Sequence, residues 1–70
     1  MQTEWEVEGR GAAAKIIASC PACHTLRQFH GDPMKVVHEK FKHNLCDGLV
    51  ESIPTEIRDQ YWERAAVSQY

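Results

Sequence analysis

The sequence predicts a small α+β domain in which β-hairpins are combined with one C-terminal helix. Residues 3–8 alternate acidic and apolar side chains, the two-residue period of a half-buried strand. Residues 54–68 carry apolar side chains at helical spacing. Between these segments lie two pairs of residues with metal-binding side chains: Cys20 with Cys23, and His43 with Cys46. Together these observations predict a metal-stabilised domain of the zinc-finger or zinc-ribbon type.

The short length of the chain leads us to expect a source of stability besides the hydrophobic core. Seventy residues form at most one domain, 1–70, and a domain of this size commonly depends on a metal, disulfides or a partner. The three cysteines are an odd number, which argues against a closed set of disulfides. We see no signal-peptide pattern and no apolar run long enough to cross a membrane. We therefore expect a monomeric protein of the reducing cytoplasm that has no contact with a membrane.

The spacing of the two pairs predicts a structural metal site. Each pair has its ligands three residues apart, so that one tight loop can turn both side chains toward the same point. Zn²⁺ takes four nitrogen or sulfur ligands in a tetrahedron, and four protein ligands leave no position for a catalytic water. The sequence therefore predicts a structural Zn²⁺ with the ligands Cys20, Cys23, His43 and Cys46.

A second ligand set is also compatible with the sequence. Cys20, Cys23, His38 and His43 would match the spacing of a two-cysteine, two-histidine finger, but Cys46 would then have no role. On a helix, His38 would lie about 140° around the axis from His43. This places it among core side chains, as a partly buried histidine. Ligand geometry therefore favours the set that contains Cys46.

Other chemistry is less well supported. The run from Cys20 to His24 matches the Cys-x-x-Cys-His attachment site of c-type cytochromes, with Met34 as the nearest second axial ligand, but it gives Cys46 no function. A coloured protein would reveal haem. The sequence has no Ser-His-Asp set, glycine-rich phosphate loop or convergent carboxylate pair, so we expect no enzyme activity.

The predicted zinc-binding unit covers residues 15–50. Its first strand is expected over 15–19, and the return strand begins after Cys23. Residues 34–46 fit two structures. A strand would make the second ligand pair a loop followed by Gly48, whereas a helix would begin at Asp32 and Pro33. The helix would collect a long apolar stripe, which favours it: Met34, Val37, Phe41, Leu45 and Leu49.

The C-terminal helix, expected over 54–68, is the clearest element. Pro54 stands near its start and Glu56 lies in the first turn, where the helix dipole favours a negative charge. Ile57, Tyr61 and Ala65 fall on one face, which we expect to pack against the metal-binding half.

Charge is unevenly distributed along the chain, although the net charge is only −2. Acidic residues alternate through the N-terminal strand, and such a strand is better suited to a basic protein surface than to nucleic acid. We expect the partner-binding residues to be Glu4, Trp5, Glu6 and Arg10. Trp5 has an alternative role as a core residue, which is the more common role of a large aromatic side chain.

The zinc-ligand pairs, the acidic N-terminal strand and the polar C-terminal helix together resemble the small zinc-finger transcription regulators of bacteriophages. More narrowly, the size and layout are similar to those of the RNA polymerase-binding antitermination type found in a Xanthomonas phage. The resemblance implies a protein that binds bacterial RNA polymerase in the host cytoplasm, inhibits initiation by hindering the σ factor and promotes antitermination. The alternative is a nucleic-acid-binding zinc finger whose phosphate contacts would be Arg27, Lys35, Lys40 and Lys42.

Overall fold

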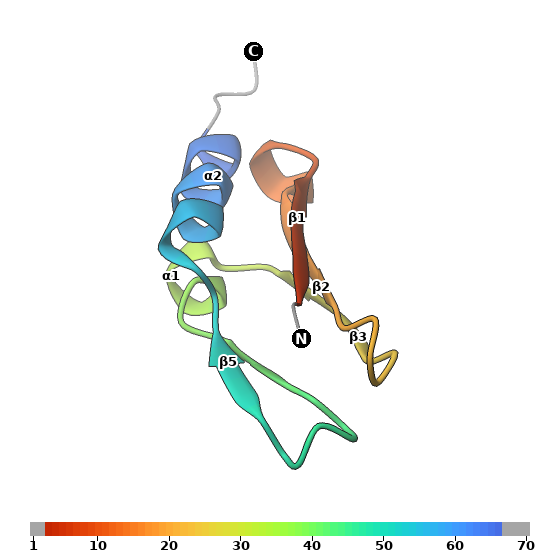
Figure 1. The fold of residues 1–70 in the computed structure, drawn as a ribbon. Helices are drawn as coiled ribbons and strands as arrows, with labels where there is room; N and C mark the ends of the chain where they lie inside the picture. The colour runs from red at the N-terminus through yellow and green to blue at the C-terminus, as the bar shows by residue number, and fades with distance from the viewer. Residues whose placement is uncertain (1–2, 67–70) are drawn as a thin grey trace.

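The computed structural model describes residues 3–66, which form a small α+β domain as predicted (Figure 1). Five strands, two helices and one 3₁₀ turn follow one another along this part of the chain. In order they are β1 (Glu4–Glu8), η1 (Gly11–Ala13), β2 (Lys15–Ser19), β3 (Leu26–His30), α1 (Pro33–Val36), β4 (Lys40–Lys42), β5 (Val50–Ser52) and α2 (Thr55–Ala65).

The strands form two separate antiparallel sheets. β1, β2 and β3 make a three-stranded sheet in that order, and β4 pairs with β5 in a hairpin. The alternation in the N-terminal sequence has the expected result, since Trp5 and Val7 are partly buried while the glutamates between them are exposed. One face of the larger sheet is therefore packed and the other carries acidic side chains.

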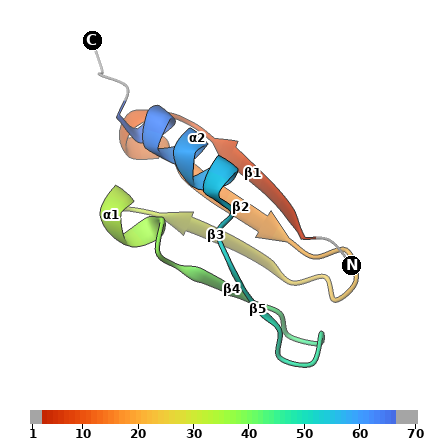
Figure 2. The same ribbon diagram turned by 60° about the vertical axis from the view of Figure 1, so that its left-hand side comes forward.

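The core lies between the larger sheet, the β4–β5 hairpin and α2. Ile16 and Ala18 from β2, Phe41 from β4 and Tyr61 from α2 are almost completely buried. Helix α2 lies beside β1, η1 and β2 (Figures 1 and 2). Its Ile57 and Ala65 pack against the core, which is the face expected from the sequence. The helix ends at Ala65, and positions 67 and 68 of the predicted range lie outside the described residues.

The expectation of a long helix over 34–46 is wrong. Helix α1 begins as expected, with the Asp32 carboxylate accepting a hydrogen bond from the Met34 N–H at 2.9 Å, but it ends at Val36. The chain then extends into β4. Phe41 and His43, two residues apart, are both fully buried and lie on one side of the extended chain, whereas on a helix they would point about 200° apart. The supposed apolar stripe is not buried as a unit, since the Leu45 side chain is 79% exposed.

A sharp turn after β1 depends on glycine. Gly9 has a φ of +76°, and a Cβ at this position would lie 2.4 Å from the carbonyl oxygen of Ala13. The Arg64 guanidinium donates to the Gly9 carbonyl at 3.3 Å, so this turn is also tied to α2. No helix within residues 3–66 combines the length and apolar character needed to cross a membrane.

Candidate metal centre

The two ligand pairs lie in loops at the ends of two different hairpins. The first loop, residues 20–25, joins β2 to β3, and the second loop, residues 43–49, joins β4 to β5. Each is closed by a backbone hydrogen bond of 2.9 Å, from Cys20 N–H to the Thr25 carbonyl and from His43 N–H to the Leu49 carbonyl. The tight reversals require left-handed backbone at His24 in the first loop and at Asp47 and Gly48 in the second. Both loops thereby direct their ligand side chains to the same point.

The side chains of Cys20, Cys23, His43 and Cys46 form a compact group, here called the Cys₃His group. Their ligand atoms all lie within 4.8 Å of one another. The sulfurs of Cys20 and Cys46 are 4.0 Å apart, and the sulfur of Cys23 is 3.4 Å from His43 Nδ1. A tetrahedral ion bound at about 2.0–2.3 Å would separate its ligand atoms by roughly 3.5–3.8 Å. The group is closed and largely buried, and it could hold a metal ion.

A carboxylate orients the histidine. His43 Nε2 lies 2.5 Å from Glu51 Oε2, and the Thr3 hydroxyl donates a hydrogen bond to the same carboxylate. With its proton on Nε2, His43 presents the lone pair of Nδ1 to the three sulfurs, which is the carboxylate–histidine–metal arrangement of many metal sites. The Glu51 hydrogen bond is the main reason that the pKa of His43 is raised to about 9. The pKa of Glu51 is lowered, first by Thr3 and then by His43.

Thr25 connects the two loops. Its hydroxyl lies 3.0 Å from the sulfur of Cys23 and accepts a hydrogen bond from the Asn44 N–H at 3.1 Å. Because the oxygen accepts from Asn44, its own proton is available to the sulfur. This contact is the main reason that the pKa of Cys23 is lowered to about 5, whereas burial raises the pKa of Cys46 to about 11. The lowered pKa favours the thiolate form of Cys23, which is the form of cysteine that binds metal ions.

Sequence reasoning found the four members of the Cys₃His group but not its supports, Thr3, Thr25 and Glu51. A signal for Glu51 was present, because pairing of β4 with β5 puts it opposite Phe41, on the face that also carries His43. This signal exists only if residues 40–52 form a strand pair, and a helix over 34–46 would not place Glu51 beside His43. Thr3 is 40 positions from His43, and no local pattern connects them.

Other predicted residues lie elsewhere. His38 is exposed and outside the group, so it is neither a ligand nor the partly buried core residue that we expected. Trp5 packs against the core, with its ring 5.9 Å from that of Phe41 in an edge-to-face arrangement. Among the expected partner-binding residues, Glu4, Glu6 and Arg10 are exposed.

Comparison with protein-family models, with curated proteins and with solved structures finds no significant match to this chain. The interpretation of the site depends on its own geometry: four soft or borderline donors, two from each hairpin, converge in a buried position. An ion bound by all four side chains would hold the β2–β3 and β4–β5 hairpins together.

Proposed function

We propose that the Cys₃His group binds a structural Zn²⁺. Three thiolates and one imidazole are a common donor set of structural zinc sites, and four protein ligands fill the tetrahedron. When bound, the ion would supply folding free energy by crosslinking the β2–β3 and β4–β5 hairpins. The observation that carries this proposal is the convergence of four ligand atoms within 4.8 Å, supported by Glu51 behind the histidine.

Removal of the supporting carboxylate tests the orientation of the histidine. We expect Glu51→Ala to lower Zn²⁺ affinity by about 10–100-fold, because His43 would lose the partner that fixes its ring and tautomer. Affinity can be measured by competition with a chromophoric chelator. Glu63→Ala is the matched control, since Glu63 is an exposed carboxylate outside the group. Equal affinity in the two variants would show that Glu51 does not position the ligand.

Zinc affinity should also increase steeply with pH. At neutral pH, His43 and Cys46 hold their protons because their pKa values are raised to about 9 and about 11, while Cys23, with a pKa of about 5, has lost its proton. Binding must displace at least two protons, so we expect a gain in affinity of at least about 100-fold per pH unit between about pH 6 and 8. If the metal-free chain is unfolded, affinity should still increase with pH, because the thiols of an unfolded chain are protonated in this range and must lose their protons to bind the ion. Chelator competition across this range would contradict the expectation if affinity were independent of pH.

We further propose that the zinc-bound domain acts as a transcription regulator through protein contacts and not as an enzyme. The support is the open face of the larger sheet, where β1 presents glutamates outward. Within residues 3–66, no ion pair neutralises Glu4 or Glu6. An uncompensated acidic row attracts a basic protein surface and repels phosphates. Because Trp5 packs inward, the contacts are assigned to Glu4 and Glu6, with Arg10 nearby in sequence.

The partner proposed from the resemblance is bacterial RNA polymerase, with inhibition of initiation and promotion of antitermination as the outcome. The experiment is capture from a nuclease-treated bacterial lysate on tagged, zinc-loaded protein, with bound chains identified by mass spectrometry. We expect polymerase subunits with the original protein and with Glu63→Lys, an exposed control, but not with the Glu4→Lys, Glu6→Lys double variant. Failure to capture polymerase, or equal capture by all three proteins, would contradict the proposal.

A nucleic-acid-binding function is the second candidate. Lys40 and Lys42 are both exposed on β4, on either side of the buried Phe41, and Arg27 and Lys35 are also exposed. Phosphate contacts make affinity fall steeply with salt. Binding of the zinc-loaded protein to bare DNA, weakened by salt and by Lys40→Ala and Lys42→Ala, would favour this function over the acidic-face proposal.

A further inference from the structure

The outer edge of β3 is unpaired. β3 is the last strand of the three-stranded sheet, and in the part of the chain from 3 to 66 no other strand pairs with it (Figure 1). The Cys20 N–H donates to the Thr25 carbonyl, which fixes the alternation of the ladder that follows. Arg27 and Phe29 therefore exchange hydrogen bonds with β2. The outward backbone groups belong to the alternate residues Leu26, Gln28 and His30.

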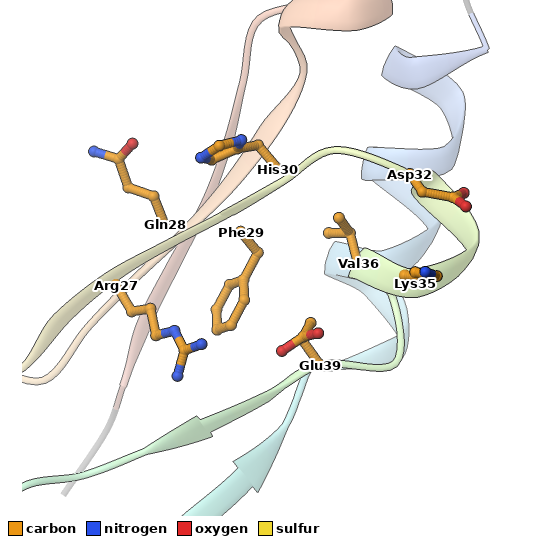
Figure 3. A pocket seen from close by; sticks show the side chains of 8 residues that line it. All are labelled: Arg27, Gln28, Phe29, His30, Asp32, Lys35, Val36 and Glu39. Atoms are coloured by element: carbon orange, nitrogen blue, oxygen red, sulfur yellow. The ribbon is translucent and has the colours of Figure 1, made fainter.

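A hollow of about 290 Å³ lies along this edge. Phe29 and Val36 are the apolar residues that line it. Glu39, which follows α1 in the chain, lies across the hollow from β3 (Figure 3). Figure 3 shows the Arg27 guanidinium, the Phe29 ring and the Glu39 carboxylate directed into the same space, with Gln28 and His30 on the other side of the strand. The edge thus has unsatisfied backbone groups beside a space with an aromatic ring and a carboxylate.

We propose that a second copy of this chain occupies the edge, with the two β3 strands antiparallel about a two-fold axis at Gln28. This register uses all three outward-facing residues of each strand and joins two three-stranded sheets into one of six strands. Leu26 then lies opposite His30 of the second copy, Arg27 opposite Phe29, and Gln28 opposite its own equivalent. No two like charges face each other directly.

Charge complementarity favours a second copy as the occupant. Arg27 already lies over the Phe29 ring of its own chain, 5.2 Å from the ring centre, so cation and ring are compatible neighbours. In the proposed register, Arg27 of the second copy lies opposite Phe29, at the rim of the hollow that also contains the Glu39 carboxylate. Each chain therefore supplies both the cation and the acidic, aromatic surface that receives it.

The other edge of the same sheet provides a contrast. Antiparallel self-pairing of β1 about Glu6 would put Glu6 opposite Glu6, and Glu4 opposite Glu8. Like charges directly opposite one another destabilise a strand pair, and charged edge strands resist self-pairing. The sequence thus blocks self-association at β1 and permits it at β3. This inference revises the expectation of a monomer and does not depend on the proposed partner.

The test is sedimentation equilibrium of the full, zinc-loaded chain from micromolar to millimolar concentration. We expect a monomer–dimer equilibrium that Gln28→Ala leaves intact, because the exposed side chain is not needed for backbone pairing. Gln28→Pro should weaken the dimer by more than about tenfold, since it removes an outward N–H from both chains without breaking a bond to β2. Metal content and circular dichroism establish that this variant is folded.

Charge variants test the register separately. Gln28→Glu and Gln28→Lys each place like charges opposite one another at the axis, and each should weaken the homodimer by about fivefold at low salt. An equimolar mixture of the two should restore association as a heterodimer. A protein that is monomeric throughout, a proline variant that is folded and dimeric, or a mixture no tighter than either charge variant alone would overturn the proposal.

Discussion

Replacing Cys23 with serine is expected to leave the protein unfolded at neutral pH even with excess Zn²⁺. Structural zinc sites contribute on the order of 10 kcal/mol of apparent binding free energy. The core of a domain below about 80 residues rarely supplies more than roughly 3–5 kcal/mol. Cys23 is one of the two ligands that the first loop supplies, so its loss removes the crosslink between the two hairpins. Far-UV circular dichroism and bound-zinc analysis measure the two effects together.

A matched pair of histidine variants controls for this result. His43→Ala should behave like Cys23→Ser, while His38→Ala should remain folded with one zinc, because His38 is exposed and outside the Cys₃His group. Treatment of the original protein with a strong chelator should reproduce the unfolding. A folded Cys46→Ser variant that retains stoichiometric zinc would contradict the assigned ligand set and return His38 to consideration.

Phe41→Ala should cause the second largest loss, about 3–5 kcal/mol of unfolding free energy in the zinc-loaded protein. Phe41 is fully buried and contacts two other rings. Its ring centroid lies 5.9 Å from that of Trp5 and 4.8 Å from that of His43. Truncation would leave a cavity where the larger sheet meets the β4–β5 hairpin, directly beside His43 of the Cys₃His group. Chemical denaturation with zinc present measures the change.

Leu45→Ala is the control for this truncation. Its side chain is 79% exposed, so the same kind of substitution should change stability by less than about 0.5 kcal/mol. A similar loss in both variants would mean that Leu45, and not Phe41 alone, belongs to the core. This would restore part of the apolar stripe expected for a helix over 34–46.

Local sequence patterns were sufficient for several elements. The alternation over 3–8 predicts a strand, and the structure has β1 at Glu4–Glu8 with the glutamates outward. The apolar spacing after Pro54 predicts a helix, and α2 begins at Thr55 with Tyr61 buried. The ligand spacing predicts a group that the structure brings together. In each case, the signal lies within one element or one short loop.

Local patterns failed where tertiary contacts decide the structure. Over 34–46 the five apolar residues fit a helix, but Phe41 on β4 and His43 just after it are both buried on one side of an extended chain. The supports of the metal group come from distant positions, since Thr3 and Glu51 meet at His43. His38 is exposed because α1 ends at Val36, so the long helix that would have placed His38 among core side chains does not form.

Zinc K-edge X-ray absorption spectroscopy of the zinc-loaded protein tests the central claim most directly. The proposed site predicts one bound zinc per chain with three sulfur neighbours at about 2.3 Å and one nitrogen neighbour at about 2.0 Å. Glu51→Ala should lower occupancy at limiting zinc without changing this coordination shell. Two sulfur and two nitrogen neighbours, an oxygen in the shell, or failure of the protein to retain zinc would contradict the Cys₃His site.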